Sequence, residues 1–137
     1  MNIGVIDHLE CYVADAESSA DYLCEAFGFR RRGSGGPEMG LSGCRSVLLG
    51  QRGISLLLTS PLEEDHPVAD YVRRHGDGVA VIAVVTDDAR TAFTEAVARG
   101  ADPVEPPGEM GQEGARVTFA SVRAFGDVAH RFVEREG

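Results

Sequence analysis

The chain has 137 residues and a formal net charge of −9, with 43% hydrophobic and 26% charged residues, which is typical of one globular domain over residues 1–137. The charge argues against a nucleic-acid partner, because phosphate binding requires clustered cations and the one cluster here is the three arginines at 30–32. No apolar run is long enough to span a membrane and the N-terminus lacks a signal-peptide pattern, so we expect a cytoplasmic protein without a membrane partner.

The first predicted element is a strand over residues 3–13. A helix follows, which begins at the N-cap residue Asp15 and ends at Gly28. One face of the strand is apolar and should carry the helix, whereas the other face is mixed. The apolar face consists of Leu9, Cys11 and Val13, and the mixed face consists of His8, Glu10 and Tyr12.

A second strand is predicted over residues 29–32, before a glycine-rich stretch at 33–43 that we expect to be a loop. Two further strands over 45–49 and 54–60 are separated by a short segment with the chemistry of a hairpin connection. The first module is therefore β-α-β-β-β and spans residues 5–61.

The chain then repeats this order after a connector over residues 62–76, which contains a short helix. Asp88 stands where Asp15 stands in the first module, and Gly100 stands where Gly28 does. The second module spans residues 77–135 and consists of a strand over 79–86, a helix after Asp88, a loop over 103–114, and strands over 116–122 and 129–135. The three cysteines have no metal-like spacing, so we expect reduced thiols at Cys11, Cys24 and Cys44.

Several short motifs occur in a characteristic order along the chain. They are Ile6-Asp7-His8-Leu9-Glu10-Cys11-Tyr12-Val13, Thr59-Ser60-Pro61-Leu62, Asp65-His66-Pro67, His75-Gly76-Asp77-Gly78-Val79, and Phe125-Gly126-Asp127 followed by His130-Arg131-Phe132-Val133-Glu134. With the duplicated module, they resemble the vicinal-oxygen-chelate superfamily of glyoxalases, bleomycin resistance proteins and dioxygenases. The motifs are most similar to the metal-free N-terminal half of 4-hydroxyphenylpyruvate dioxygenases and hydroxymandelate synthases. The resemblance covers essentially the whole chain and implies an α+β fold with a cupped mixed sheet around one cavity.

The resemblance also bears on metal binding. Metalloenzymes of the superfamily take a histidine from the first strand of one module, a second ligand from the first strand of the other, and a glutamate from the last strand. His8, Val81 and Val133 stand at these positions, and valine has no lone pair for a metal. Glu134 is one residue away, but strand alternation would direct it to the opposite face. We therefore expect no metal, no cofactor and no assigned catalytic residue, with His8 as a hydrogen-bonded cavity-wall histidine or, alternatively, a lone ligand.

The first functional hypothesis is a non-catalytic protein that sequesters a hydrophobic aromatic natural product, such as an enediyne or glycopeptide antibiotic, for self-resistance. The loops at 33–43 and 103–114 would act as adaptable lids. We predict that the ligand-binding residues are His8, Glu10, Tyr12, Leu57, Val81, Ala83, Phe119, Arg131 and Val133.

Two alternatives remain open from the sequence. One is a metal-dependent dioxygenase, isomerase or lyase of the same superfamily, which would use a different ligand register or acid–base chemistry through His8 and Glu10. The other is an accessory subunit. Under all three hypotheses we expect a homodimer, because the superfamily pairs chains through sheet edges and the first strand, and a bare edge promotes aggregation.

Overall fold

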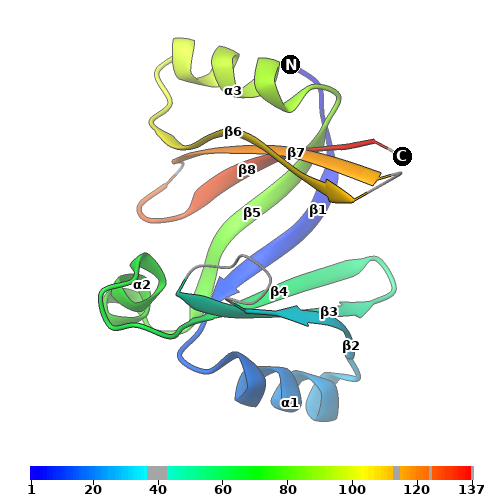
Figure 1. Ribbon diagram of the computed structural model, residues 1–137, viewed down its shortest axis with the longest axis vertical. Helices are drawn as coiled ribbons and strands as arrows, with labels where there is room; N and C mark the ends of the chain where they lie inside the picture. The colour runs from blue at the N-terminus through cyan, green and yellow to red at the C-terminus, as the bar shows by residue number, and fades with distance from the viewer. Residues whose placement is uncertain (37–42, 113–114, 124, 137) are drawn as a thin grey trace. The chain divides into compact units, whose positions relative to one another are not determined.

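The computed structural model describes residues 1–36, 43–112, 115–123 and 125–136 (Figure 1). The chain divides into two units. The central unit is His8–Ala80, and the terminal unit combines Met1–Asp7 with Val81–Gly137. Within the described ranges, no helix is long and apolar enough to cross a membrane.

The central unit contains most of the first β-α-β-β-β module together with the connector helix. Its strands are hydrogen-bonded in the order β2-β3-β4-β1, and β1 runs parallel to β4 while the other pairs are antiparallel. The elements are β1 (Ile3–Tyr12), α1 (Ala16–Phe27), β2 (Arg30–Gly35), β3 (Cys44–Gln51), β4 (Ile54–Pro61) and α2 (Pro67–His75).

Local sequence explains why α1 begins and ends where it does. The Asp15 carboxylate accepts a hydrogen bond from the backbone N–H of Ser18 at 3.2 Å, which satisfies one of the unpaired donors of the first turn. Gly28 ends the helix in the left-handed conformation with φ of 78°, and its N–H donates to the Cys24 carbonyl. Both predicted boundaries are confirmed.

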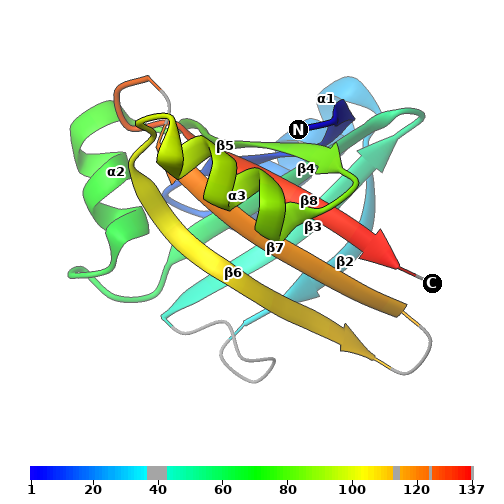
Figure 2. The same ribbon diagram turned by 90° about the horizontal axis from the view of Figure 1, so that it is seen from above.

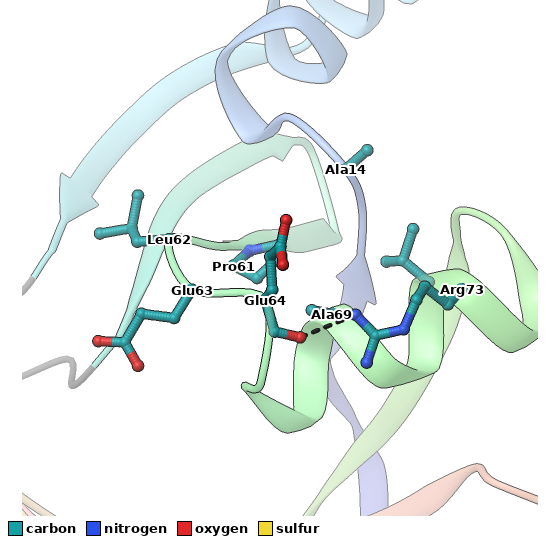
Figure 3. A pocket seen from close by; sticks show the side chains of 8 residues that line it. Ala14, Pro61, Leu62, Glu63, Glu64, Ala69 and Arg73 are labelled. Carbon is teal, nitrogen blue, oxygen red and sulfur yellow. Dashed lines mark hydrogen bonds between the residues drawn. The ribbon is translucent and has the colours of Figure 1, made fainter.

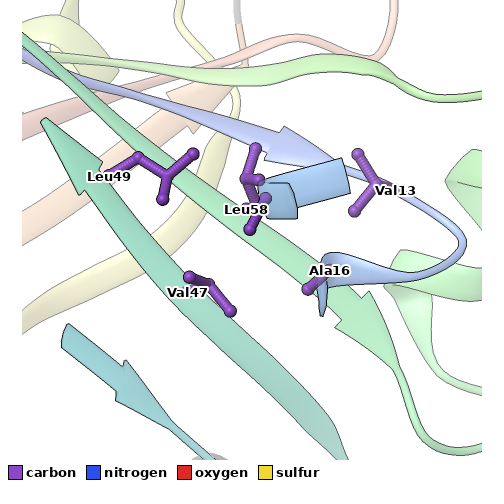
Figure 4. Packing of buried hydrophobic residues seen from close by; sticks show 6 residues of the cluster. Val13, Ala16, Val47, Leu49 and Leu58 are labelled. Atoms are coloured by element: carbon purple, nitrogen blue, oxygen red, sulfur yellow. The ribbon is translucent and has the colours of Figure 1, made fainter. Parts of the chain in front are cut away.

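The helix α1 covers one face of its sheet. Ala16 and Ala20 of the helix have no exposed surface, and they pack with strand residues to form the core of the central unit. Figure 4 shows Val47, Leu49 and Leu58 on their strands together with Val13 and Ala16. The buried residues of this core are Val13, Ala16, Ala20, Val47, Leu49 and Leu58.

The terminal unit repeats the same construction. Its strand order is β5-β8-β7-β6, with the start of β1 beside β5, and β5 runs parallel to β8. The helix α3 contacts β7 and β8 (Figure 2) and buries Ala89 and Ala92 against Val122 and Phe132. The elements are β5 (Gly78–Thr86), α3 (Ala89–Ala98), β6 (Pro103–Gln112), β7 (Ala115–Arg123) and β8 (Ala129–Glu136).

The predicted α+β class, with two β-α-β-β-β modules in a mixed sheet, is confirmed. The module bounds 5–61, 62–76 and 77–135 stay predictions.

Two predicted loops are wrong where the structure describes them. Residues 33–35 extend β2, because Gly35 pairs with Ser46 of β3, and residues 37–42 of that prediction lie outside the described ranges. The segment predicted as a loop over 103–114 forms strand β6 over Pro103–Gln112, and residues 113–114 lie outside the described ranges. The register shifts between Pro103, Glu105 and Gly108, so the prolines are accommodated at irregular positions of a terminal strand. A lid role for residues 103–112 is therefore not retained.

Candidate functional site

A buried chain of polar side chains crosses three strands of the central unit. Thr59 of β4 donates a hydrogen bond to the Glu10 carboxylate of β1 at 2.6 Å, and the hydroxyls of Thr59 and Ser46 of β3 lie 2.8 Å apart. The exposed fractions are 7% for Glu10, 3% for Thr59 and 8% for Ser46. A threonine hydroxyl has one proton, and Thr59 gives it to Glu10, so Ser46 is the donor in the second bond. We call Glu10, Thr59 and Ser46 the polar triad.

The other predicted site residues of the central unit are half-buried. His8 and Leu57 lie on β1 and β4, and Tyr12 meets the ring of Tyr71 edge-on with centroids 5.3 Å apart. Tyr71 belongs to α2, and its hydroxyl donates to the Val79 carbonyl at 3.0 Å. The connector helix therefore holds the aromatic ring against which Tyr12 packs, which supports Tyr12 at one end of the face that carries the polar triad.

The charge of Glu10 influences neighbouring thiols. Burial, and then the negative charge of Glu10, raise the pKa of Cys11, and the same two causes in the same order raise the pKa of Cys44. Both shifts disfavour the thiolate, so neither environment activates a cysteine nucleophile. The predicted free cysteines are confirmed at Cys11, Cys24 and Cys44.

The predicted site residues of the terminal unit are mostly apolar, and three of them are buried. Ala83 of β5 and Val133 of β8 are 0% and 1% exposed, and Val81 is 3% exposed. Phe119 of β7 is half-buried, and its ring lies over Gly108 of β6, where an added Cβ would meet the ring at 3.5 Å. We call Ala83, Val133 and Phe119 the apolar triad.

The two triads occupy equivalent positions in the two modules. Asp15 and Asp88 cap the corresponding helices, and this spacing matches positions of β1 to positions of β5. Strand pairing extends the match to the other strands. The parallel pair β1–β4 has the same register as β5–β8, and the antiparallel pair β3–β4 has the same register as β7–β8. The equivalent pairs are Glu10 and Ala83, Thr59 and Val133, and Ser46 and Phe119.

One polar group accompanies the apolar triad in the terminal unit. Arg131 of β8 places its guanidinium 3.6 Å from the Glu105 carboxylate of β6, and Ser121 of β7 donates to the same oxygen at 2.9 Å. The Arg131 side chain is 16% exposed. The Glu105 carboxylate, held by the Ser121 hydroxyl, thus pairs with Arg131, and the sequence alone did not identify Glu105 or Ser121.

The residues present do not fit the metal set of the superfamily. Val81 and Val133 carry no donor atom, and the Glu134 carboxylate accepts the backbone N–H of Ala89 at 2.9 Å. Glu134 is therefore committed to the first turn of α3, on the opposite side of β8 from Val133, as strand alternation predicts. Among the described residues, no group of three or more His, Cys, Asp or Glu side chains could hold a metal ion. The expected absence of a metal and a cofactor stays a prediction.

Described residues of the central unit line two surface pockets. The larger, which we call the α1 groove, has a volume of about 430 Å³ and is bounded by β1, β4, α1 and residues 77–79. The smaller, of about 290 Å³, lies beside α2, where Arg73 donates to the Glu64 carbonyl at 2.7 Å (Figure 3). None of the nine predicted ligand-binding residues lines either of these pockets.

Sequence reasoning missed the α1 groove because it assigned the whole of one β1 face to packing under the helix. Cys11 and Val13 do pack there, but they also form part of the groove wall. The one available signal was the serine pair Ser18–Ser19 followed by Tyr22 in α1, where a fully packed helix face would carry apolar residues.

Comparison with known proteins identifies the relatives of the chain. A family model described as Glyoxalase/Bleomycin resistance protein/Dioxygenase superfamily matches residues 5–128. A 4-hydroxyphenylpyruvate dioxygenase of Dictyostelium discoideum is 35% identical over 131 residues, which are 94% of this chain and 36% of that protein. The chain thus spans little more than a third of this curated relative.

Solved structures agree in fold. A mutant of 4-hydroxymandelate synthase from Streptomyces coelicolor has a TM-score of 0.89 and 33% identity, with coverage of 99% of this chain and 42% of that one. Methylmalonyl-CoA epimerase from Mycobacterium tuberculosis has a TM-score of 0.76 at 20% identity, with coverage of 96% and 88%. The second likeness concerns the fold alone. The resemblance to this superfamily and to 4-hydroxyphenylpyruvate dioxygenases, predicted from the motifs, is confirmed.

Proposed function

The chain belongs to the Glyoxalase/Bleomycin resistance protein/Dioxygenase superfamily, and we propose that it serves there as a non-catalytic protein that sequesters a hydrophobic aromatic small molecule. The observation that carries the proposal is the hydrogen bond from Ala89 to Glu134. Glu134, the carboxylate next to the third ligand position, caps helix α3 instead of facing the site. The second and third ligand positions hold Val81 and Val133, which have no donor atom for a metal. A cavity without these metal donors can still bind a small molecule, but it cannot perform metal-dependent chemistry.

Each unit supplies its own ligand contacts in this proposal. In the central unit, Tyr12 and Leu57 offer half-exposed apolar surface beside the polar triad. In the terminal unit, Phe119 and Arg131 are the reachable residues, since Val81, Ala83 and Val133 are almost fully buried. Flat aromatic compounds with a few polar substituents are the class that suits such surfaces, and natural-product antibiotics are the members to test first.

The experiment is a thermal-shift screen with polycyclic aromatic and macrocyclic antibiotics, followed by recovery of any bound compound. A ligand at a hundredfold excess over its dissociation constant stabilises the fold by about 2.7 kcal/mol, which gives a readily measured rise in Tm. We expect Phe119→Ala to weaken the shift, because it removes the half-buried ring. The matched control is Phe125→Ala, which removes a ring that is 84% exposed in a turn.

Two results would contradict sequestration. One is the absence of a shift across the panel, and the other is recovery of the compound in a chemically altered form. Val81→Asp is unsuitable as a binding test, because Val81 is 3% exposed and an unpaired carboxylate there would unfold the protein. Leu57→Asn is preferable, since Leu57 is half-buried and the variant changes the ligand-facing surface of β4 without burying a charge.

An enzyme is the alternative, and two relatives favour it: a 4-hydroxyphenylpyruvate dioxygenase at 35% identity and a mutant of 4-hydroxymandelate synthase at 33%. A metal-dependent dioxygenase, isomerase or lyase would require ligands other than those tested above. Elemental analysis separates the two functions, because about one equivalent of iron, zinc, manganese or nickel, lost with His8→Ala, would replace the binding proposal with the enzyme.

We also propose a cytoplasmic homodimer that pairs through the first part of β1. In the terminal unit, Ile3, Val5 and Ile6 of this strand are 54%, 74% and 57% exposed, although all three are aliphatic. Neighbouring positions of a strand point to opposite faces, so both faces of this segment are open to a second copy. Sedimentation should show a dimer for the wild type and a monomer for Val5→Glu, and a wild-type monomer near 14.6 kDa would refute this arrangement.

A further inference from the structure

The α1 groove has the size and chemistry of a small-molecule site. Its volume of about 430 Å³ falls in the range of natural ligand pockets. Cys11, Val13 and Leu58 provide an apolar floor, and these residues belong to the face of the sheet that α1 covers. The groove lies wholly within the central unit, and it is separate from the polar triad because Leu58 and Thr59 are consecutive in β4 and point to opposite faces.

The walls of the groove supply an aromatic ring and hydroxyl groups. Ser18, Ser19 and Tyr22 come from α1, and Tyr22 is 62% exposed although it is a large aromatic residue. Its ring meets Phe27 at a centroid distance of 6.0 Å, and Phe27 is 57% exposed. Tyr22 therefore provides an exposed aromatic ring beside an apolar floor, and such rings are common on surfaces that bind flat ligands.

The charge of the groove has one sign. Asp77 is the one ionisable carboxyl group among the described lining residues, and none of those residues is an arginine. The backbone N–H of Ala14 donates to the Asp77 carboxylate at 2.9 Å, which holds this carboxylate in place. Asp15 and Glu25 extend the acidic character, because both are exposed and share the helix face of Ser18 and Tyr22 at spacings of three and four residues.

We propose that the α1 groove binds a small aromatic cation. The apolar floor takes the ring system, the Tyr22 ring packs against it, and the Asp77 carboxylate faces the positive charge. A positive ligand is favoured over a neutral one because Asp77 lines the groove, Asp15 and Glu25 lie on the exposed face of α1, and no described lining residue is an arginine. This site does not depend on the proposed function, whose ligand contacts lie on other residues.

The experiment compares two probes of the same shape: the N-methylacridinium cation and acridine, at a pH where acridine is neutral. Fluorescence titration measures the dissociation constant of each. We expect the cation to bind more tightly, and Asp77→Asn to weaken the cation about threefold to fivefold while acridine is unchanged. Asparagine keeps an acceptor for the Ala14 N–H, so the backbone of the groove is retained. Asp102→Asn, which removes one exposed acid of the terminal unit, is the matched control and should leave both probes unchanged.

A second variant locates the site. Val79→Arg places a cation in the groove at a residue that is 39% exposed, and it should reduce cation binding at least about tenfold without loss of Tm. In the wild type, addition of the cation should change the amide chemical shifts of Ser19, Gly78 and Val79. Equal binding of the two probes, no saturable binding, or shifts centred on Tyr12 and Leu57 would overturn the proposal. The last of these outcomes would instead support the ligand face of the proposed function.

Discussion

The two modules share their helix side and differ on the other side of the sheet. Ala16 and Ala89 are both fully buried at the first helical position, and each follows an aspartate that accepts the N–H three residues later. On the opposite face, the first module has the polar triad and the second has the apolar triad at matching registers. The packing under the helix is thus the same in the two modules, while the side chains on the opposite face differ in polarity.

This contrast shows which positions the backbone dictates. A helix of small residues over a sheet requires alanine where the two approach most closely, since a larger side chain there would force the layers apart. The opposite face accepts either a hydrogen-bonded acid or a set of apolar side chains, provided that each buried polar group has a partner. Function is therefore to be sought where the modules differ, and each difference can be tested by exchange.

The largest effect is expected when one triad member is exchanged alone. Ala83→Glu gives the second module the glutamate that the first module has at Glu10. Ala83 is 0% exposed, and the neighbouring Val133 cannot donate a hydrogen bond to the new carboxylate. We expect a loss of more than about 3 kcal/mol in the free energy of unfolding, measured in urea. The double variant Ala83→Glu/Val133→Thr should recover about 1 kcal/mol, because threonine supplies the donor that Thr59 supplies to Glu10. Equal stability of the single and double variants would show that the registers are not equivalent.

A smaller effect is expected when the donor of the polar triad is removed. Thr59→Val preserves shape but leaves Glu10 and Ser46 without their hydroxyl partner, and it should cost about 1–3 kcal/mol by urea unfolding. The matched control is Thr86→Val. The Thr86 hydroxyl is buried and has no hydrogen-bond partner among the described residues, and its equivalent in the first module is Val13. That substitution should stabilise the fold by about 1 kcal/mol, and destabilisation by both changes would contradict this interpretation.

The fold could be predicted largely from the sequence because its signals are local. The aspartate caps, the terminal glycine of α1 and the alternating strands each depend on neighbouring residues, and they placed both helices of the modules. The strand β6 was missed because its glycines and prolines indicate a loop, and only pairing with β7 fixes them in an extended form. Long-range pairing is information that local sequence does not carry.

The candidate site could be predicted only in part. Glu10 and Tyr12 were identified by strand alternation, but the partners Thr59 and Ser46 lie on other strands, and their proximity depends on register. Strand alternation correctly predicted that Glu134 points to the face opposite Val133. Its hydrogen bond from the Ala89 N–H could not be predicted from residue spacing. The burial of Val81, Ala83 and Val133 depends on what covers them, which alternation does not reveal.

A still smaller effect is expected at the helix caps, and it should differ between modules. Asp88 accepts the Thr91 N–H at 3.0 Å, and Glu134 separately accepts the Ala89 N–H, so the first turn of α3 has two acids. We therefore expect Asp15→Ala to lower the Tm more than Asp88→Ala does, because α3 retains the acceptor Glu134, whereas Glu17 in the first turn of α1 is paired with Arg31. Adding Glu134→Ala to Asp88→Ala should remove the difference, because alanine has no acceptor for the Ala89 N–H. If Asp88→Ala proved the more damaging of the two single changes, Glu134 would have no capping role.

The smallest effect concerns acid pH. The bond from the Ser18 N–H lowers the pKa of Asp15 below its ordinary value of 3.8, and the bond from the Thr91 N–H does the same for the pKa of Asp88. A carboxyl group whose pKa is lower in the folded state stabilises the fold above its ordinary pKa, and this stabilisation is lost as the pH falls through the lowered value. Asparagine accepts the same hydrogen bond but does not titrate in this range. Asp15→Asn/Asp88→Asn should therefore lose less stability than the wild type when urea unfolding is followed from neutral pH to below 3.8. Parallel curves for the two proteins would mean that the caps contribute no pH dependence.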